Sequence, residues 1–165
     1  MEKWRLYLRE AHNEAQLALR CWTAFVHAEE VANLEDVFFH LHHFILHATN
    51  VDKLLDAKSG STRQRLLADQ IDLNGVDLKA CRRLRNHLEH FDERLDLWID
   101  RYDGHAFFDR NIVTGAKAFP TKTFLRALDG HTFKFHGEDY DLDEVRATMS
   151  NIAERLAAII DPGDS

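Results

Sequence analysis

Glycine and proline are scarce in this chain, and that scarcity limits the folds open to it. The 165 residues include 7 Gly and 2 Pro, and neither type interrupts residues 2–31. Because these residues end helices and build tight turns, their rarity favours long helices over a turn-rich β fold. Apolar side chains recur at helical spacing over 2–31, so we expect one long helix there.

Local signals place the next helices. Asn33, with Asp36 three residues on, is typical of a helix N-cap, and we expect that helix to reach about Lys58, before Ser59–Thr62. A short helix follows over 62–70, and then a turn over 72–75. An apolar stripe predicts a third long helix over 76–102: Leu84, Leu88, Phe91, Leu95, Trp98 and Tyr102.

The C-terminal third has a different pattern. Residues 104–120 are expected to be irregular, with a short strand at Ile112-Val113. Asp129-Gly130 between two β-rich runs, 123–128 and 132–136, predicts a β-hairpin, and residues 136–139 a second turn. Asp141 and Glu144 resemble a capping box, which predicts a last helix over 142–160.

These elements predict a mainly α fold: an up-and-down helical bundle with a small β-hairpin before the C-terminal helix. We expect one domain over 1–165, with a helical bundle core at 1–102, an irregular segment and hairpin at 103–140, and a closing helix at 141–160.

Composition excludes several classes of protein. A hydrophobic content of 45% is enough for a packed core, and no apolar run approaches the roughly 18–20 residues that span a bilayer. The first residues lack an apolar signal core, and Cys21 and Cys81 form no CxxC motif, so we expect a cytoplasmic protein.

Charge sets a condition on any nucleic-acid role. The net charge of −7 makes general affinity for nucleic acid poor, so binding requires a local basic patch. The only concentrated basic region surrounds residues 79–85. Protonating all 11 His would change −7 to +4, so the surface field should respond strongly to pH near 6–7.

The densest polar stretch lies within the predicted helix 76–102. Five of its side chains share one face of a helical wheel, beside the apolar stripe: Arg83, Asn86, His87, His90 and Arg94. Four others should point to bulk solvent: Arg85, Glu89, Asp92 and Asp96. Partial burial beside a core makes the pKa values of such groups tunable, so this face is a candidate site.

The residues Arg85-Asn86-x-x-x-His90 resemble the Arg-x(4–6)-His motif of the HEPN superfamily, in which a polar residue typically follows the arginine. The resemblance covers the motif and, loosely, the helical order of residues 1–102. HEPN domains are four- to five-helix bundles, and many are metal-independent endoribonucleases of toxin–antitoxin, abortive-infection and CRISPR-associated systems.

The resemblance implies roles for these residues. His90 acts as general acid/base, Arg85 contacts the scissile phosphate, and Asn86 orients His90. It further implies a composite site in a homodimer, RNA as substrate, products with 2′,3′-cyclic phosphate ends, no metal or cofactor, and a possible protein antitoxin or regulator. The identity of the motif arginine stays open, since Arg85 and His90 lie about 140° apart on an ideal helix whereas Arg83 shares the face of His90.

A second polar stripe lies on the helix predicted after Asn33. His40, His43, His47 and Asn50 share a face there, and three interpretations stay open. They are a histidine-rich packing surface, a metal site, and one wall of an RNA cleft. The substrate-binding set on the last interpretation comprises Arg83, His87, His43, His47 and Arg82. The metal set would comprise His40, His43, His47 and His87.

Two alternatives to a ribonuclease therefore stand. One is a non-catalytic HEPN-like module that binds nucleotide, RNA or a protein. The other is a metal-binding helical bundle, although neither helix contains the Glu-x-x-His pair on which di-iron bundles rely.

Overall fold

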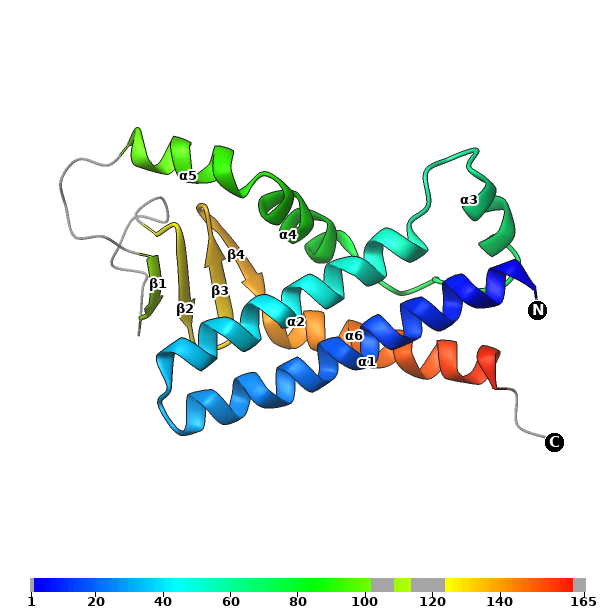
Figure 1. The fold of residues 1–165 in the computed structure, drawn as a ribbon, viewed down its shortest axis with the longest axis horizontal. Helices are drawn as coiled ribbons and strands as arrows, with labels where there is room; N and C mark the ends of the chain where they lie inside the picture. Colours follow the sequence, from blue (N-terminus) through cyan, green and yellow to red (C-terminus); the bar gives the residue numbers. More distant parts are fainter. Residues whose placement is uncertain (1, 102–108, 114–123, 162–165) are drawn as a thin grey trace. The chain divides into compact units, whose positions relative to one another are not determined.

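The computed structural model describes residues 2–101, 109–113 and 124–161, which form six helices and four strands (Figure 1). Two compact units can be distinguished along the chain. The first takes in Met1–Arg82 and Val145–Ser165, and the second takes in Arg83–Glu144. The described helices confirm the mainly α prediction, and among them none is long and apolar enough to cross a membrane.

A long antiparallel helical hairpin dominates the first unit. Helices α1 (Lys3–Glu30) and α2 (Leu34–Leu55) lie side by side, joined by a three-residue link (Figure 1). Asn33 is the N-cap of α2, as predicted, because its side-chain oxygen accepts from the N–H of Asp36 at 3.3 Å. Helix α2 ends at Leu55, three residues before the predicted end at Lys58.

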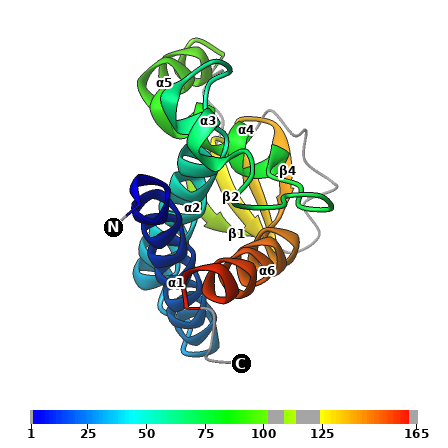
Figure 2. The same cartoon turned by 90° about the vertical axis from the view of Figure 1, so that its right-hand side faces the viewer.

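Two further helices complete this unit. The described part of α6 (Leu142–Ile160) beyond Glu144 runs beside α1 (Figure 2), where the guanidinium of Arg146 lies 5.9 Å from the ring centre of Trp22. Helix α3 (Thr62–Leu67) starts at its cap Ser61 and is shorter than the predicted 62–70. The predicted turn at 72–75 is present, and Arg155 donates to the carbonyls of Asp72 and Asn74 at 2.8 and 3.1 Å.

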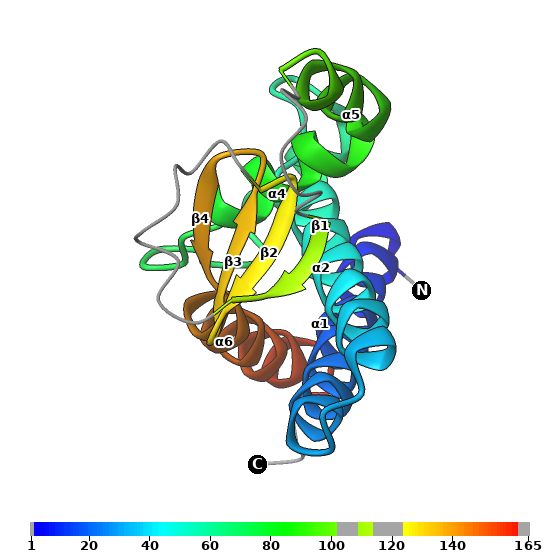
Figure 3. The same ribbon diagram turned by 90° about the vertical axis from the view of Figure 1, so that its left-hand side faces the viewer.

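The second unit contains a four-stranded sheet (Figure 3). Its order is β1-β2-β3-β4, with β1 parallel to β2 and the other pairs antiparallel. The strands are β1 (Asp109–Ile112), β2 (Arg126–Asp129), β3 (Thr132–Phe135) and β4 (Glu138–Asp141). Strands β2 and β3 are the predicted hairpin, and Gly130 adopts the left-handed φ of 55° that its tight turn requires.

The sequence predicted a β-hairpin alone, whereas the structure has a four-stranded sheet that contains this hairpin. The second predicted turn contains only His136 and Gly137, whose φ angles are both positive, and Glu138 already starts β4. Strand β4 was missed because its sequence, Glu-Asp-Tyr-Asp, is rich in residues that strands avoid, and it is an edge strand with only Tyr140 buried. The predicted strand at Ile112-Val113 appears as β1, which starts three residues earlier.

Helix α6 begins and ends where the sequence predicted. The side chain of Asp141 accepts from the N–H of Glu144 at 3.1 Å, which satisfies one exposed donor of the first turn. This capping contact joins residues three apart in sequence, so it fixes the start of α6 without help from the rest of the fold.

Candidate functional site

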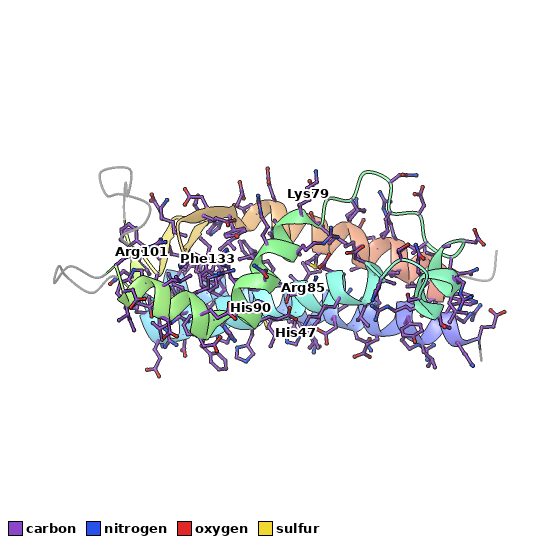
Figure 4. All side chains as sticks on the ribbon, turned by 90° about the horizontal axis from the view of Figure 1, so that it is seen from above. His47, Lys79, Arg85, His90, Arg101 and Phe133 are labelled. Atoms are coloured by element: carbon purple, nitrogen blue, oxygen red, sulfur yellow. The ribbon has the colours of Figure 1, made fainter. Side chains whose placement is uncertain are left out.

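The three motif residues belong to the second unit: Arg85 and Asn86 lie in the C-terminal half of α4 (Lys79–Glu89), and His90 directly follows it. Figure 4 labels Arg85 and His90. Asn86 is exposed, and its backbone carbonyl accepts from the N–H of His90 at 3.2 Å. Arg85 forms an ion pair of 4.0 Å with Glu89, one helical turn on. The Arg85 side chain is only 25% exposed, so its predicted direction toward bulk solvent was wrong.

The prediction of one helix over 76–102 was wrong, because two helices lie in this range. Helix α4 starts at Lys79 and ends at Glu89, and α5 runs over Phe91–Ile99; Tyr102 lies outside the described residues. His90 separates them with φ −115° and ψ 36°, while hydrogen bonds continue on both sides. Because the apolar spacing continues through one non-helical residue, periodicity alone could not show the break.

His90 is the N-cap residue of α5, and a carboxylate holds its ring. The Nδ1 atom lies 3.2 Å from Oε1 of Glu93, and the His90 side chain is 46% exposed. The acidic pair Asp92 and Glu93 in the first turn of α5 is the pattern favoured at a helix N-terminus. That local pattern could have predicted both the break and the partner of His90.

Arg83 and His87 turn toward the sheet instead. The ring of His87 stacks on Phe135 with centroids 4.8 Å apart, and its Nε2 lies 3.6 Å from Oε1 of Glu138. Arg83 lies over the ring of Tyr140 at 5.6 Å and pairs with Glu138 at 3.8 Å. The predicted single face therefore divides: His87 is buried against Phe135, and Arg83 contacts Glu138 and Tyr140 but stays exposed, as Asn86 and His90 do.

Burial has the largest effect on the pKa values of His87 and Tyr140. Burial lowers the pKa of His87, assisted by the charges of Arg94 and His136 and opposed by Glu138. Burial first, and then the hydrogen bond from the hydroxyl of Tyr140 to Glu138 at 2.8 Å, raise the pKa of Tyr140. With a side chain only 6% exposed, His87 is enclosed and is poorly placed to contact a large substrate such as RNA.

The histidines of α2 lie in the first unit and have partners of their own. The Nδ1 atom of His47 lies 2.8 Å from Oε2 of Glu14 on α1, and the side-chain amide of Asn50 donates to the same oxygen at 3.0 Å. His43 donates from Nδ1 to the backbone carbonyl of Phe39 at 2.8 Å. Glu14 was missed by sequence reasoning because nothing local connects residues 33 positions apart.

Arg82 is occupied by two carboxylates. Its Nη2 atom lies 3.3 Å from Oδ1 of Asp52, a fully buried side chain, and 2.8 Å from Oδ2 of Asp56. Beside them, burial first and then the charge of Asp52 raise the pKa of the Cys81 thiol to about 12. The contacts of Arg82 are those of a residue that stabilises the first unit, although sequence reasoning placed it with substrate.

No group of three or more His, Cys, Asp or Glu among the described residues is arranged to hold a metal ion. His40, His43 and His47 are residues of the first unit and His87 is a residue of the second, and all four are described. The hypothesis of a metal site on these histidines therefore gains no support from the contacts of the described residues.

Comparisons of this chain with protein-family models, with curated proteins and with solved structures found no match. The resemblance to HEPN domains accordingly rests on Arg85, Asn86 and His90 as they stand in the sequence.

Proposed function

We propose that this chain is a metal-independent endoribonuclease resembling HEPN domains, in which His90 transfers protons and Arg85 stabilises the charge of the phosphate. The observation that carries the proposal concerns His90, which directly follows the helix that contains Arg85 and Asn86. His90 is exposed, and the carboxylate of Glu93 lies 3.2 Å from its Nδ1 atom. A carboxylate on one ring nitrogen fixes the tautomer and orients the ring, so the other nitrogen can exchange a proton with a substrate.

The reaction is an internal transfer at phosphorus. A base takes the proton of the ribose 2′-hydroxyl, the 2′-oxygen attacks phosphorus, and the bond from phosphorus to the 5′-oxygen breaks as that oxygen gains a proton. The products carry a 2′,3′-cyclic phosphate and a 5′-hydroxyl. The guanidinium of Arg85 stabilises the negative charge that develops on the phosphoryl oxygens.

The spacing of the motif supports a site shared between two copies of the chain. An ideal helix would place Arg85 and His90 about 140° apart around its axis, although His90 itself lies just beyond the end of α4. We propose that these two side chains of one copy do not face a single phosphate directly. A two-fold axis beside α4 would bring His90 of one copy toward Arg85 of another. Arg83 pairs with Glu138 and Arg85 with Glu89, so these contacts leave the choice of motif arginine open, and the proposal takes Arg85 because Asn86 follows it as the motif requires.

Partners follow from this proposal. RNA is the substrate, a homodimer is the active form, and a toxin or defence effector of this kind is held inactive by a protein antitoxin or regulator. The chain's charge of −7 makes general RNA binding weak, so cleavage should depend on contacts near the motif and fall with added salt.

The test compares single-stranded RNA cleavage by the wild type, His90→Ala and His27→Ala, all in excess chelator. His27 is a matched control, because it is exposed and its Nδ1 lies 3.7 Å from Glu30, also three residues on. We expect cyclic-phosphate ends from the wild type, a loss of about 100-fold or more in His90→Ala, and no change in His27→Ala. Full activity of His90→Ala would refute the role of His90.

If the wild type does not cleave RNA, a non-catalytic HEPN-like module replaces the ribonuclease as the proposed function. Wild-type protein that binds RNA or a nucleotide without turnover, and does so equally well as His90→Ala, would support the module. The same preparations therefore decide between an enzyme and a binding protein.

A further inference from the structure

Four basic side chains gather near the turn between β3 and β4, all within the second unit. The ring of His87 on α4 lies 6.1 Å from that of His136, the first residue of this turn. Burial has the largest lowering effect on the pKa of each ring, and the charge of Arg94 on α5 lowers both further. Arg101, just beyond α5 (Figure 4), also lowers the pKa of His136. These four residues form what we call the basic group.

Aromatic packing fixes the two helices of the basic group against the sheet. The ring of His87 stacks on Phe135 of β3 at 4.8 Å, and the ring of Phe91, at the start of α5, lies 6.3 Å from the same phenylalanine. The basic side chains therefore approach one another because their elements pack together, at the cost of mutual repulsion.

Positive charge is incompletely neutralised there. Glu138 opposes it, but this carboxylate is shared, since it lies 3.6 Å from Nε2 of His87 and 3.8 Å from Nε of Arg83. Arg94 and Arg101 form no ion pair within the part of the chain that the structure describes. In a chain of net charge −7, two such arginines beside two histidines are the local basic patch that phosphate binding requires.

Two buried nitrogens of the basic group have no hydrogen-bond partner among the described residues. They are Nδ1 of His87, whose side chain is 6% exposed, and Nε of Arg94. Buried polar atoms are nearly always paired in native proteins, so each exception points to strain or to a bound group that completes it. A guanidinium only donates, so Arg94 needs an acceptor, and a phosphate oxygen is a strong one.

The backbone of the turn also favours a role for His136. His136 and Gly137 have φ angles of 51° and 86°, the left-handed values of a two-residue hairpin turn. Such turns favour Asn-Gly, so the turn by itself does not account for an imidazole at this position. The conformation holds the ring of His136 beside the basic group.

We propose that Arg94, Arg101 and His136 form a phosphate-binding site at the β3–β4 turn, with the enclosed His87 beside it. The two guanidinium groups donate to phosphate oxygens, and His136 does so when its ring is protonated. The ligand chemistry is a phosphate group, carried by the backbone of RNA or by a free phosphate compound. For RNA the inference rests on the proposed ribonuclease function, and it gives the substrate a second contact within the unit that contains the motif.

The first test does not need cleavage. NMR titration of the histidine rings gives the pKa of His136 and His87 in the wild type alone, with inorganic phosphate, and with a 2′-O-methyl oligoribonucleotide that cannot be cleaved. Ionic strength is matched with chloride. Bound phosphate adds negative charge, so we expect the pKa of both rings to rise, while that of His27 in the first unit stays unchanged. No rise for His136 with either probe would overturn the site.

The two probes identify the source of the phosphate. A rise at lower concentrations of the oligonucleotide than of inorganic phosphate would assign the site to the RNA backbone. A rise at equal concentrations of phosphate groups would assign it to a free phosphate compound. Either result supports a phosphate-binding site.

The second test measures KM and kcat for single-stranded RNA in Arg94→Gln, Arg101→Gln and His136→Asn. Asparagine tolerates the left-handed conformation, so the turn is kept, and Arg101 is exposed, so its variant stays informative if Arg94→Gln unfolds. We expect KM to rise about 3–10-fold in each variant, with kcat within about twofold of the wild type. Arg110→Gln is the control, because Arg110 is exposed on β1, at the edge of the sheet opposite β4.

The outcomes separate this inference from the proposed function. Wild-type protein that cleaves RNA, with KM unchanged in all three folded variants and no rise in the pKa of His136, would overturn the phosphate site alone. Wild-type protein that does not cleave RNA, but whose His136 responds to phosphate, would support the site and remove the ribonuclease.

Discussion

His90 and Glu93 face each other across the point where α4 ends and α5 begins, with Nδ1 and Oε1 3.2 Å apart. His90 leaves the helical conformation at this point and is the N-cap residue of α5. Glu93 lies three residues on, in the first turn of α5.

Replacing Glu93 by Gln should lower the cleavage rate about 10–100-fold, because the ring of His90 loses its charged orienting partner. The fold should be unaffected, since both side chains are exposed. The measurement is the single-turnover rate, with Glu30→Gln on the matched pair of α1 as the control. Equal rates for Glu93→Gln and the wild type would show that the carboxylate has no role in proton transfer.

A composite site in a homodimer predicts complementation. Arg85→Ala and His90→Ala should each be inactive alone, whereas a mixture that exchanges subunits should recover up to about a quarter of wild-type activity. Half of the dimers would then be mixed, and each would contain one intact site of two. Recovery after mixing is measured by RNA cleavage. No recovery, with subunit exchange verified by mass, would place Arg85 and His90 of one copy in the same site.

Acidification should destabilise the protein partly through His87. Burial lowers the pKa of His87, so between its unfolded value near 6.5 and the lower folded value the unfolded state binds more protons. The stabilisation is therefore complete above the unfolded value and is lost as the pH falls toward the folded one. The pKa of His136 is lowered in the same direction, also by burial first.

The measurement is urea unfolding at pH 7.5 and 5.5. His87→Phe keeps an apolar ring beside Phe135, and it should lose less stability on acidification than the wild type, by about 1.4 kcal/mol for each unit of pKa shift. His27→Phe, on the exposed face of α1, should follow the wild type. The same pH dependence in His87→Phe and the wild type would contradict this account.

Arg82 should matter for stability more than for RNA. Arg82→Met removes one ion-pair partner of the fully buried carboxylate of Asp52, so we expect a loss of about 1–3 kcal/mol in the free energy of unfolding. Lys79→Met is the control, because its ion pair with Asp77 is exposed and should be worth less than about 1 kcal/mol. Equal stability of the two variants would indicate that Arg82 is free to serve the substrate.

Much of the fold was predictable from local signals. The caps Asn33 and Asp141 fixed the starts of α2 and α6 because their hydrogen bonds join residues three apart. Periodicity predicted α1 within a residue or two at each end. The α4–α5 break and strand β4 escaped because one non-helical residue hardly disturbs the apolar spacing, and an acidic edge strand resembles a turn.

The sequence by itself determined α1, α2, α6 and the β2–β3 hairpin, since each depends on neighbours within a few positions. Only the tertiary structure decided which polar side chains have partners. It turned Arg83 and His87 to the sheet, occupied Arg82 with Asp52 and Asp56, and set Glu14 against His47. Those contacts join residues 26 to 55 positions apart, and a helical wheel cannot show them because it contains only one helix.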